Sequence, residues 1–442
     1  MILIGNGRVF TRDENNPYIE NGAVLIDGKY IKAIGKTEDL KAKYPDADYK
    51  DAKGRLVMPG FINTHMHYYS TFARGMFLDN PPATMFSDVL KGLWWRLDRT
   101  LTLEDVYYSA IMPMIEQIKC GVTTVIDHHA SAHAVEGSLF RIADAAREIG
   151  IRSNLCYETS DRDGEAIALA GIKENADFIK YCNEQKDDMI KGLFGFHASM
   201  TVSDKTLDAS LAAAANVNGG FHVHCAEGIE DIADSLAKYN QRVIERWYKR
   251  GVFNEKSIAV HCIHVTSDEI DMLKDSKVAV VHNPESNMGN AVGIAPILEM
   301  MKRGVLVGLG TDGYTADMTE SYKVANIIHK HEQKLPSVGW VEAPTMFFDN
   351  NKKIANRFID GSVGTLKEGE YADIIIVDYK EPTPLNASNL NGHILFGVSG
   401  RNVDTTIING RVIMDERKLV NIDEDRISAR SVELAKELWK RI

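Results

Sequence analysis

The stretch VMPGFINTHMH (residues 57–67) is an apolar run that ends in two histidines separated by one residue. Side chains two apart on a β-strand point to the same side, so the imidazoles of His65 and His67 can reach one metal ion. Spacing alone leaves metal binding and a hydrogen-bonded polar core about equally open. The rest of the chain favours metal binding, because runs of the same kind recur along it.

Seven further apolar, strand-like runs follow, each succeeded by a helical stretch. They end near His128, Glu158, His197, His224, His261, His282 and Thr311. The intervening segments, such as residues 103–121 and 138–150, repeat apolar residues with the period of a helix. Apart from one long insertion after the first run, the spacing suits βαβ units of roughly 30 residues. We therefore expect an α/β protein with a (β/α)₈ TIM-like barrel, whose chemistry lies at the carboxyl ends of its strands.

Both ends of the chain differ from this central region. They contain short apolar runs separated by turns, such as Asn409-Gly410 between two β-rich runs. A small β-sandwich domain built from both ends would explain why this pattern of short strands occurs twice. The last residues form an amphipathic helix that we expect on the outside of the barrel. The predicted division is a composite β-domain of residues 1–57 and 361–420, a barrel of residues 58–360 and a C-terminal helix of residues 421–442.

Composition limits the classes of partner. The 442 residues are 44% hydrophobic and 26% charged, which excludes a disordered chain. A net charge of −11 without a basic patch argues against a nucleic-acid polymer and favours a small-molecule ligand. No apolar run approaches the roughly 18 residues of a membrane span, and a secretory signal is missing, so we expect a cytoplasmic protein. The five scattered cysteines indicate reduced thiols in the core. The sequence leaves open whether the protein forms a homo-oligomer.

Later strand ends supply further polar groups. His222 and His224 end the fifth run and Glu227 follows in the loop, while His261 and Asp312 lie at the ends of the sixth and eighth. His222 lies one layer deeper, where a core role outweighs ligation. Taken singly, Asp312 could cap a helix and His261 could be a core residue. Together, so many inward polar groups would be costly to bury unless they bind a metal or each other.

The motifs PGFxxxHxH, HxxE, AVHC, HNPxSN and GTDG together resemble the amidohydrolase superfamily, in the branch of cytosine, guanine and S-adenosylhomocysteine deaminases and chlorohydrolases. The stretches LWWRLDR, VIDHHAS and ETSDRD further resemble the SsnA-type aminohydrolases. The likeness implies metal ligation by His65, His67, His224 and Asp312, a proton shuttle at Glu227, a water contact at His261 and a substrate contact at His197. The fourth strand end has no lysine to carry the carbamate of dinuclear members, so we expect one divalent metal ion, Zn or Fe.

The resemblance implies a metal-dependent hydrolase of carbon–nitrogen bonds other than peptide bonds. The expected reaction is the deamination of a purine-, pyrimidine- or triazine-like heterocycle, with Glu227, His261 and Asp312 as catalytic groups. Cyclic-amide hydrolysis or dechlorination at the same metal site is the alternative. A scaffold barrel without activity would be expected to lack a ligand, and none is missing.

Substrate contacts are less defined by the sequence. Trp94 lies among aromatic residues of the long insertion, which could either cover a flat ring or pack as core. Arg74 and Arg162 are candidates for binding an anionic or carbonyl group. Because neighbouring strand residues alternate, only one of His128 and His129 can face the barrel interior.

Overall fold

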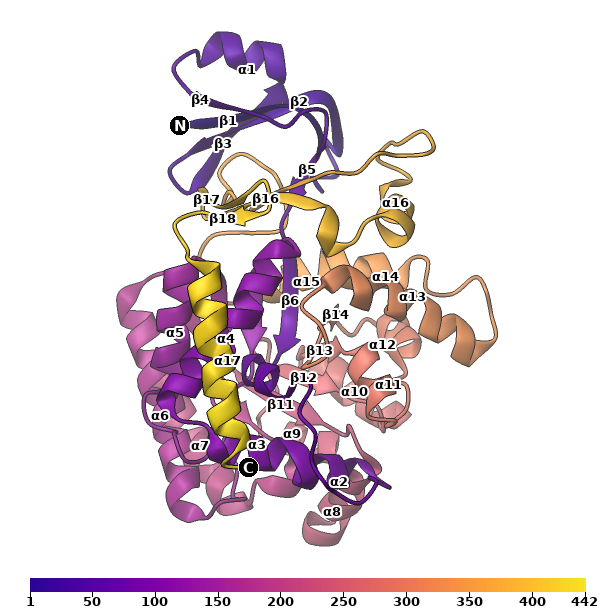
Figure 1. Ribbon diagram of the computed structural model, residues 1–442. Helices are drawn as coiled ribbons and strands as arrows, with labels where there is room; N and C mark the ends of the chain where they lie inside the picture. Colours follow the sequence, from indigo (N-terminus) through magenta and orange to yellow (C-terminus); the bar gives the residue numbers. More distant parts are fainter.

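The computed structural model describes residues 1–442 and shows a parallel barrel with a separate sheet at one end (Figure 1). The barrel strands are β6 (Phe61–Met66), β7 (Val122–Asp127), β8 (Arg152–Leu155), β9 (Ile190–Gly192), β10 (Phe194–Phe196), β11 (Phe221–Cys225), β12 (Ile258–His261), β13 (Ala279–His282) and β14 (Val307–Leu309). Only Leu193 separates β9 from β10, so we count these two pieces as one strand. The barrel then has the eight strands that the sequence predicted.

Two parallel sheets, β6-β7-β8-β9 and β10-β11-β12-β13-β14, make up the barrel wall. Bridge pairs join them at both seams, between Thr159 and Phe196 and between Met66 and Asp312. The amides of Thr311 and Asp312 both donate to the carbonyl oxygen of His65, at 3.0 and 3.1 Å. The eighth strand therefore adjoins the first, which brings Asp312 beside the two histidines of the first strand.

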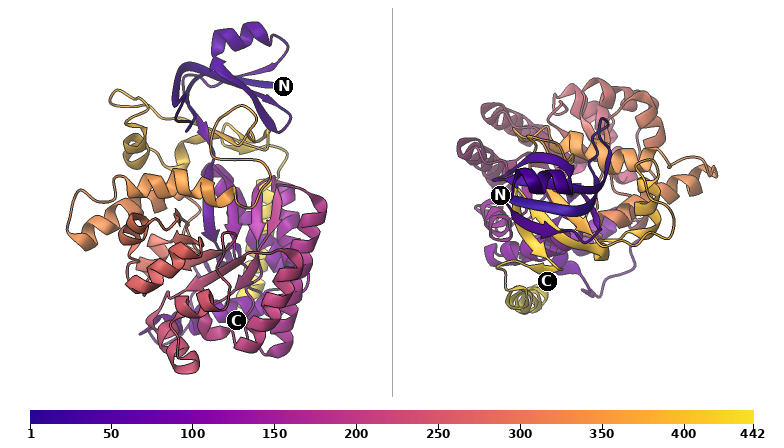
Figure 2. Two further views of the ribbon diagram at one scale, coloured as in Figure 1. Left: turned by 180° about the vertical axis from the view of Figure 1, so that it is seen from behind. Right: turned by 90° about the horizontal axis from the view of Figure 1, so that it is seen from above.

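Helices surround the strands on the outside (Figure 2). They are α4 (Leu103–Lys119), α5 (Ser138–Ile149), α6 (Glu165–Gln185), α7 (Asp204–Val217), α8 (Ile229–Tyr239), α9 (Val243–Lys249), α10 (Ser267–Asp275), α11 (Pro284–Gly289), α12 (Ile297–Arg303), α13 (Met318–Gln333), α14 (Glu342–Pro344), η4 (Thr345–Asn350) and α15 (Asn351–Ala355). Local sequence sets their ends: Thr102 and Asp105 form a capping box at the start of α4, and Gly150 ends α5 with φ +83°.

The strands at both ends of the chain form one nine-stranded sheet with the order β18-β17-β16-β15-β5-β1-β2-β3, in which β4 also pairs with β1. They are β1 (Ile2–Phe10), β2 (Tyr18–Asp27), β3 (Tyr30–Lys36), β4 (Asp48–Asp51), β5 (Leu56–Pro59), β15 (Ile374–Val377), β16 (Val403–Ile408), β17 (Arg411–Asp415) and β18 (Lys418–Leu419). The helices α1 (Thr37–Lys43) and α16 (Leu390–Gly397) and the turn η5 (Gly400–Asn402) belong to the same segments. One hydrophobic cluster contains Ile4 and Val57 from the start of the chain together with Ile374 and Ile407 from its end. The separate sheet from both chain ends is therefore confirmed, while the domain limits drawn from the sequence stay a prediction.

The run at residues 57–67 differs from the single strand that its sequence suggests. It divides into β5, which lies in the end sheet between β1 and β15, and β6, which lies in the barrel. Gly60 joins them, and a Cβ atom there would lie 2.2 Å from Cγ2 of Thr123. Only glycine lets the chain pass this closely to β7, and the apolar pattern on either side does not reveal the change of direction.

The insertion after β6 contains η1 (Tyr68–Ala73), α2 (Phe86–Val89), η2 (Leu90–Trp94) and α3 (Trp95–Thr100), and η3 (Ser199–Thr201) follows β10. The C-terminal helix α17 (Glu424–Trp439) packs outside the barrel against α4, and the indole of Trp439 donates to the carbonyl of Phe72 at 2.8 Å. The insertion lies at the carboxyl ends of the barrel strands, opposite the end sheet (Figure 1). None of the helices combines the length and the apolar character needed to span a bilayer.

Candidate active site

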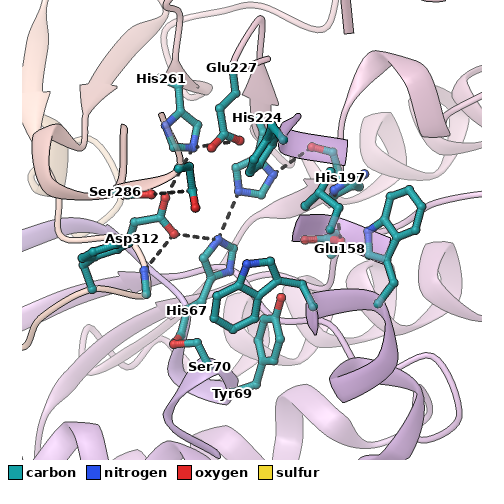
Figure 3. A pocket seen from close by; sticks show the side chains of 17 residues that line it. His67, Tyr69, Ser70, Glu158, His197, His224, Glu227, His261, Ser286 and Asp312 are labelled. Atoms are coloured by element: carbon teal, nitrogen blue, oxygen red, sulfur yellow. Dashed lines mark hydrogen bonds and ion pairs between the residues drawn. The ribbon is translucent and has the colours of Figure 1, made fainter. Parts of the chain in front are cut away.

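A pocket opens at the carboxyl ends of the barrel strands, and part of its wall comes from the insertion (Figure 3). Its lining includes His67, Tyr69, Trp94, Trp95, Glu158, His197, His224, Glu227, His261, Ser286, Asn290, Asp312 and Tyr314. The strand ends contribute the titratable groups and the insertion contributes the aromatic wall.

The ring nitrogens of His67 and His224 face each other. Their Nε2 atoms are 3.2 Å apart, and the Nε2 atom of His67 is 3.4 Å from Oδ1 of Asp312. Backbone carbonyls occupy the other ring nitrogens: Nδ1 of His67 lies 2.6 Å from the oxygen of His128, and Nδ1 of His224 lies 2.9 Å from that of His197. Since a carbonyl can only accept, both protons sit on Nδ1 and both Nε2 lone pairs point at each other. Such an arrangement is repulsive unless a cation lies between them.

His65 completes this donor set from one layer deeper. Its Nε2 atom is buried without a hydrogen-bond partner, and its ligand atom lies within 4.8 Å of those of His67 and Asp312. Its Nδ1 atom pairs with Nε2 of His222 at 2.9 Å. His222 therefore orients a neighbouring histidine from the core. Burial holds the pKa values of His65, His222 and His224 well below the usual range, so these rings are neutral. The residues present fit a divalent metal ion.

Two carboxyl groups flank His261. Its Nε2 atom is 3.4 Å from Oε2 of Glu227 and 3.5 Å from Oδ2 of Asp312, while Nδ1 lies 2.8 Å from Oδ1 of Asn287. Burial and the charge of Asp312 raise the pKa of Glu227 well above its usual value. Burial opposes ionisation of Asp312, yet His67 and His261 hold the pKa of Asp312 below its usual value. The pKa values of the two carboxyl groups are thus shifted in opposite directions, which suits one proton donor and one proton acceptor.

The turn that carries Glu227 has an unusual backbone. Ala226 has φ +50°, a conformation that side chains other than glycine rarely adopt. Asp231 in α8 stabilises it, because its carboxylate accepts from the amides of Ala226 and Met200 at 3.1 and 2.9 Å. His261 and Asp312 also have positive φ, +67° and +54°. Strained residues of this kind cluster at functional sites, where the chain directs a side chain to a required position.

His197 and Trp94, expected to contact substrate, both line the pocket. The Nδ1 atom of His197 is bound to Oγ1 of Thr201 at 2.7 Å, and its ring meets that of Trp95 edge to face with centroids 5.9 Å apart. The insertion thus has two layers: Trp94 and Trp95 face the pocket, whereas Phe72 is buried in the core.

The two arginines proposed from the sequence do not reach the pocket wall. Arg74 forms a bidentate pair with Glu116 at 2.6 and 2.8 Å, outside this pocket. Arg162 is buried and binds Asp98 at 2.7 Å. In both cases a carboxylate from another element binds the guanidinium, although Nη1 of Arg162 has no hydrogen-bond partner. Neither arginine lines the pocket.

Of the two adjacent histidines, His128 faces the interior. Its Nε2 atom lies 3.1 Å from the carbonyl oxygen of Phe196 and 3.2 Å from that of His222. His129 instead turns to Oγ of Ser131, 2.9 Å away. These carbonyl partners make His128 a donor, and they leave its Nδ1 atom facing Glu158.

Glu158, Ser286, Asn290 and Tyr314 line the pocket although their sequence context gave them no role. Only Glu158 had a detectable signal, since it is a charged residue at a predicted strand end. Burial opposes its ionisation, but His197, His128 and Arg162 bring the pKa of Glu158 well below its usual value.

The chain also resembles known proteins along nearly its whole length. A family model described as "Amidohydrolase family" matches residues 56–413, and a second, "Imidazolonepropionase-like composite domain, bacteria", matches residues 22–47. The chain belongs to the amidohydrolase family. Among its relatives, a 5-methylthioadenosine/S-adenosylhomocysteine deaminase of Pelotomaculum thermopropionicum is 31% identical over 448 residues, covering 100% of this chain and 99% of that protein.

Solved structures share the fold. An adenosine deaminase from Xanthomonas campestris with bound zinc superposes with a TM-score of 0.86 at 22% identity, over 100% of this amidohydrolase and 99% of that chain. An atrazine chlorohydrolase from Arthrobacter aurescens complexed with zinc gives a TM-score of 0.82 at 22% identity, over 98% and 100%. The predictions of a TIM-like barrel and of an amidohydrolase enzyme are confirmed, and its donor set supports a divalent metal ion. The narrower likeness to the SsnA group stays a prediction.

Proposed function

We propose that this amidohydrolase binds one zinc or iron ion and deaminates an amino-substituted, purine-like heterocycle with release of ammonia. The observation that carries the proposal is the presence in one pocket of the facing nitrogens of His67 and His224 and of Glu227, a buried carboxyl group with a raised pKa. A neutral carboxylic acid beside a metal-binding set is suited to protonating a ring nitrogen. The similarity to a deaminase of purine nucleosides supports the substrate class.

His65, His67, His224 and Asp312 would hold the ion. When bound, it supplies the Lewis acidity that makes a water molecule nucleophilic at neutral pH. The second ring nitrogens of His67 and His224 are fixed by backbone carbonyls, so both rings are oriented before an ion arrives.

The remaining groups move protons. Asp312 is the ionised carboxylate and accepts a proton from the attacking water. Glu227 donates its proton to the ring nitrogen next to the amino-bearing carbon, which makes that carbon electrophilic. The Nε2 atom of His261 lies within 3.5 Å of both carboxyl groups and can hold the attacking water between them. Proton transfer to the amino group and cleavage of the carbon–nitrogen bond then give ammonia and the oxo product.

The aromatic wall restricts the substrate to a flat ring. Trp94, Trp95 and Tyr69 line the pocket and offer apolar faces for stacking. Neither Arg74 nor Arg162 lines the pocket, so a neutral heterocycle fits better than a carboxylated one.

A substrate panel tests the proposal. Zinc-loaded and iron-loaded enzyme is incubated with aminopurines, their nucleosides, aminopyrimidines and aminotriazines, and ammonia is measured. We expect the highest kcat/KM among the aminopurine compounds. Chloride release from a chlorotriazine, or ring opening of a cyclic amide, without ammonia from any amino compound would contradict deamination and favour the alternative reactions at the same site.

A further inference from the structure

Glu158 is a carboxylate of the pocket that the reaction described above does not use. It follows β8 and lines the pocket beside His197, and in Figure 3 His67 and His224 lie between it and Asp312. Only 5% of the residue is exposed. The reacting groups therefore gather on one side of the pocket and Glu158 lies on the other.

Three basic side chains lie near the carboxylate, but none is within close hydrogen-bonding distance. Its oxygens are 3.3 Å from Nδ1 of His128, 3.8 Å from Nη2 of Arg162 and 3.9 Å from Nε2 of His197. Hydrogen bonds from nitrogen to oxygen have lengths of about 2.7 to 3.2 Å. An ionised carboxylate can accept about four of them, and burying it without partners costs free energy. The carboxylate oxygens can therefore accept hydrogen bonds from a molecule that enters the pocket.

The neighbours of Glu158 cannot easily move to fill this capacity. Arg162 is fixed by Asp98 at 2.7 Å and by Oγ of Ser160 at 3.2 Å. The ring of His128 is fixed by two backbone carbonyls on its other nitrogen. The arrangement keeps the negative charge in place while its oxygens stay open.

Metal ligation is the other reading of Glu158, because its carboxylate lies within 4.8 Å of ring nitrogens of His67, His128 and His224. His67 and His224 each have one free lone pair, however, since their Nδ1 atoms bind backbone carbonyls. Those lone pairs already converge with His65 and Asp312. A second ion at Glu158 would lack enough ligands, so a substrate contact explains its position better.

We propose that Glu158 determines substrate specificity by accepting a hydrogen bond from an N–H or O–H group of the substrate on the side that faces away from Asp312 and Glu227. This inference rests on the proposed function for the orientation of the substrate. Such a donor has two sources: the ring N–H of a free base, or a hydroxyl of a sugar attached to it.

Two pairs of compounds separate these sources. Adenine is compared with 9-methyladenine, which lacks the N9–H group, and adenosine with 2′,3′-dideoxyadenosine, which lacks the 2′- and 3′-hydroxyls and keeps the 5′-hydroxyl. Binding is measured by calorimetry and turnover by ammonia release, for the natural enzyme and for Glu158→Gln. In one pair we expect the natural enzyme to prefer the donor-bearing member by roughly 10- to 100-fold, the usual effect of a hydrogen bond to a charged group. Glu158→Gln should reduce this preference to less than about threefold with unchanged metal content.

The matched control is Glu174→Gln, which alters a buried carboxylate that accepts from the amides of Gly137 and Leu139, outside the pocket. It should leave the preference unchanged. If Glu158→Gln does not fold, Glu158→Asp must show the same loss, because it keeps the charge beside Arg162 but withdraws the oxygens by one methylene group.

Three results would overturn the inference: equal weakening of both members of each pair in Glu158→Gln, loss of the metal in that variant, or no preference in the natural enzyme. A natural enzyme that binds with the expected preference but releases no ammonia would instead refute the proposed deamination and leave the role of Glu158 intact.

Discussion

At the scale of single residues, the positions of the histidine ring protons determine what the predicted metal site can bind. His67 and His224 each place a proton toward a carbonyl, which forces their lone pairs together. His65 adds a buried, unpartnered nitrogen to the same space. Three neutral imidazoles and one carboxylate form a set suited to zinc or iron.

The first prediction concerns His65. His65→Ala removes a ligand from the deepest layer of the set, so the purified variant should retain less than about a tenth of the metal of the natural protein. The natural protein itself should contain close to one equivalent by elemental analysis. His264→Ala, which changes a partly buried histidine beyond the strand end, is the control and should keep the metal. Two tightly bound equivalents in the natural protein would contradict the mononuclear centre.

The second prediction separates proton transfer from ligation. Four protein groups already converge on the metal position, so Glu227 should face the substrate and not complete the coordination. Glu227→Gln should keep the metal and lose on the order of 10² to 10⁴ in kcat. Asp234→Asn alters a carboxylate on the following helix that pairs with Lys238, and kcat should stay unchanged. A metal-free Glu227→Gln, or one with normal turnover, would show that the shuttle assignment is wrong.

The sequence was enough to propose these residues as ligands, but it did not show what the arginines bind. The histidines and Asp312 follow from strand ends, because a barrel brings all its strand ends to one mouth. Arg74 and Arg162 depend on Glu116 and Asp98, which lie 42 and 64 positions away. Nothing in a linear pattern indicates which carboxylate a guanidinium will meet. No role was predicted for Glu158 for a similar reason, since His128 and His197 beside it come from other strands of the barrel.

At the scale of elements, strand ends were predicted closely and strand joints were not. The predicted ends at His224 and His261 lie within one residue of the ends of β11 and β12. The joint between β5 and β6 was missed, because apolar residues continue on both sides of Gly60. The period of apolar residues shows which side of an element is buried. The change of chain direction at Gly60 depends instead on one close contact with Thr123.

The third prediction concerns the turn between β11 and α8. Asp231 accepts from the amides of Ala226 and Met200, and Asp231→Asn leaves one of these buried amides without an acceptor. An unsatisfied buried group costs about 1 to 3 kcal/mol, so the melting temperature should fall by several degrees. Because the same turn carries Glu227, kcat should fall more than KM changes, with the metal retained. A stable variant with normal kcat would mean that the turn holds its shape without Asp231.

At the scale of the whole molecule, the barrel carries the pocket at one end and the sheet at the other (Figure 1). Contacts at the amino ends of the strands join the two. Arg152, the first residue of β8, binds both carboxylate oxygens of Asp373 at 3.0 and 3.1 Å, and Asp373 also accepts from the amide of Asn409 at 2.7 Å. The side chains of Arg152 and Asp373 are only 2% and 1% exposed. One buried ion pair thus ties the barrel to the strands from the end of the chain.

The fourth prediction tests this connection. Arg152→Met leaves the carboxylate of Asp373 buried without its partner, and breaking a buried pair costs about 3 to 5 kcal/mol, whereas an exposed pair contributes about 1 kcal/mol or less. Lys53→Met is the control, because Lys53 and Glu416 form an ion pair at 3.1 Å between the two ends of the chain within the end sheet, and both side chains are largely exposed. Chemical denaturation should therefore show a large loss of stability for Arg152→Met and almost none for Lys53→Met. If the sheet and barrel unfold as one unit, the single transition of Arg152→Met moves to lower denaturant. If instead the sheet unfolds first, a second transition appears while the metal stays bound. The sheet and the barrel would then unfold independently of each other.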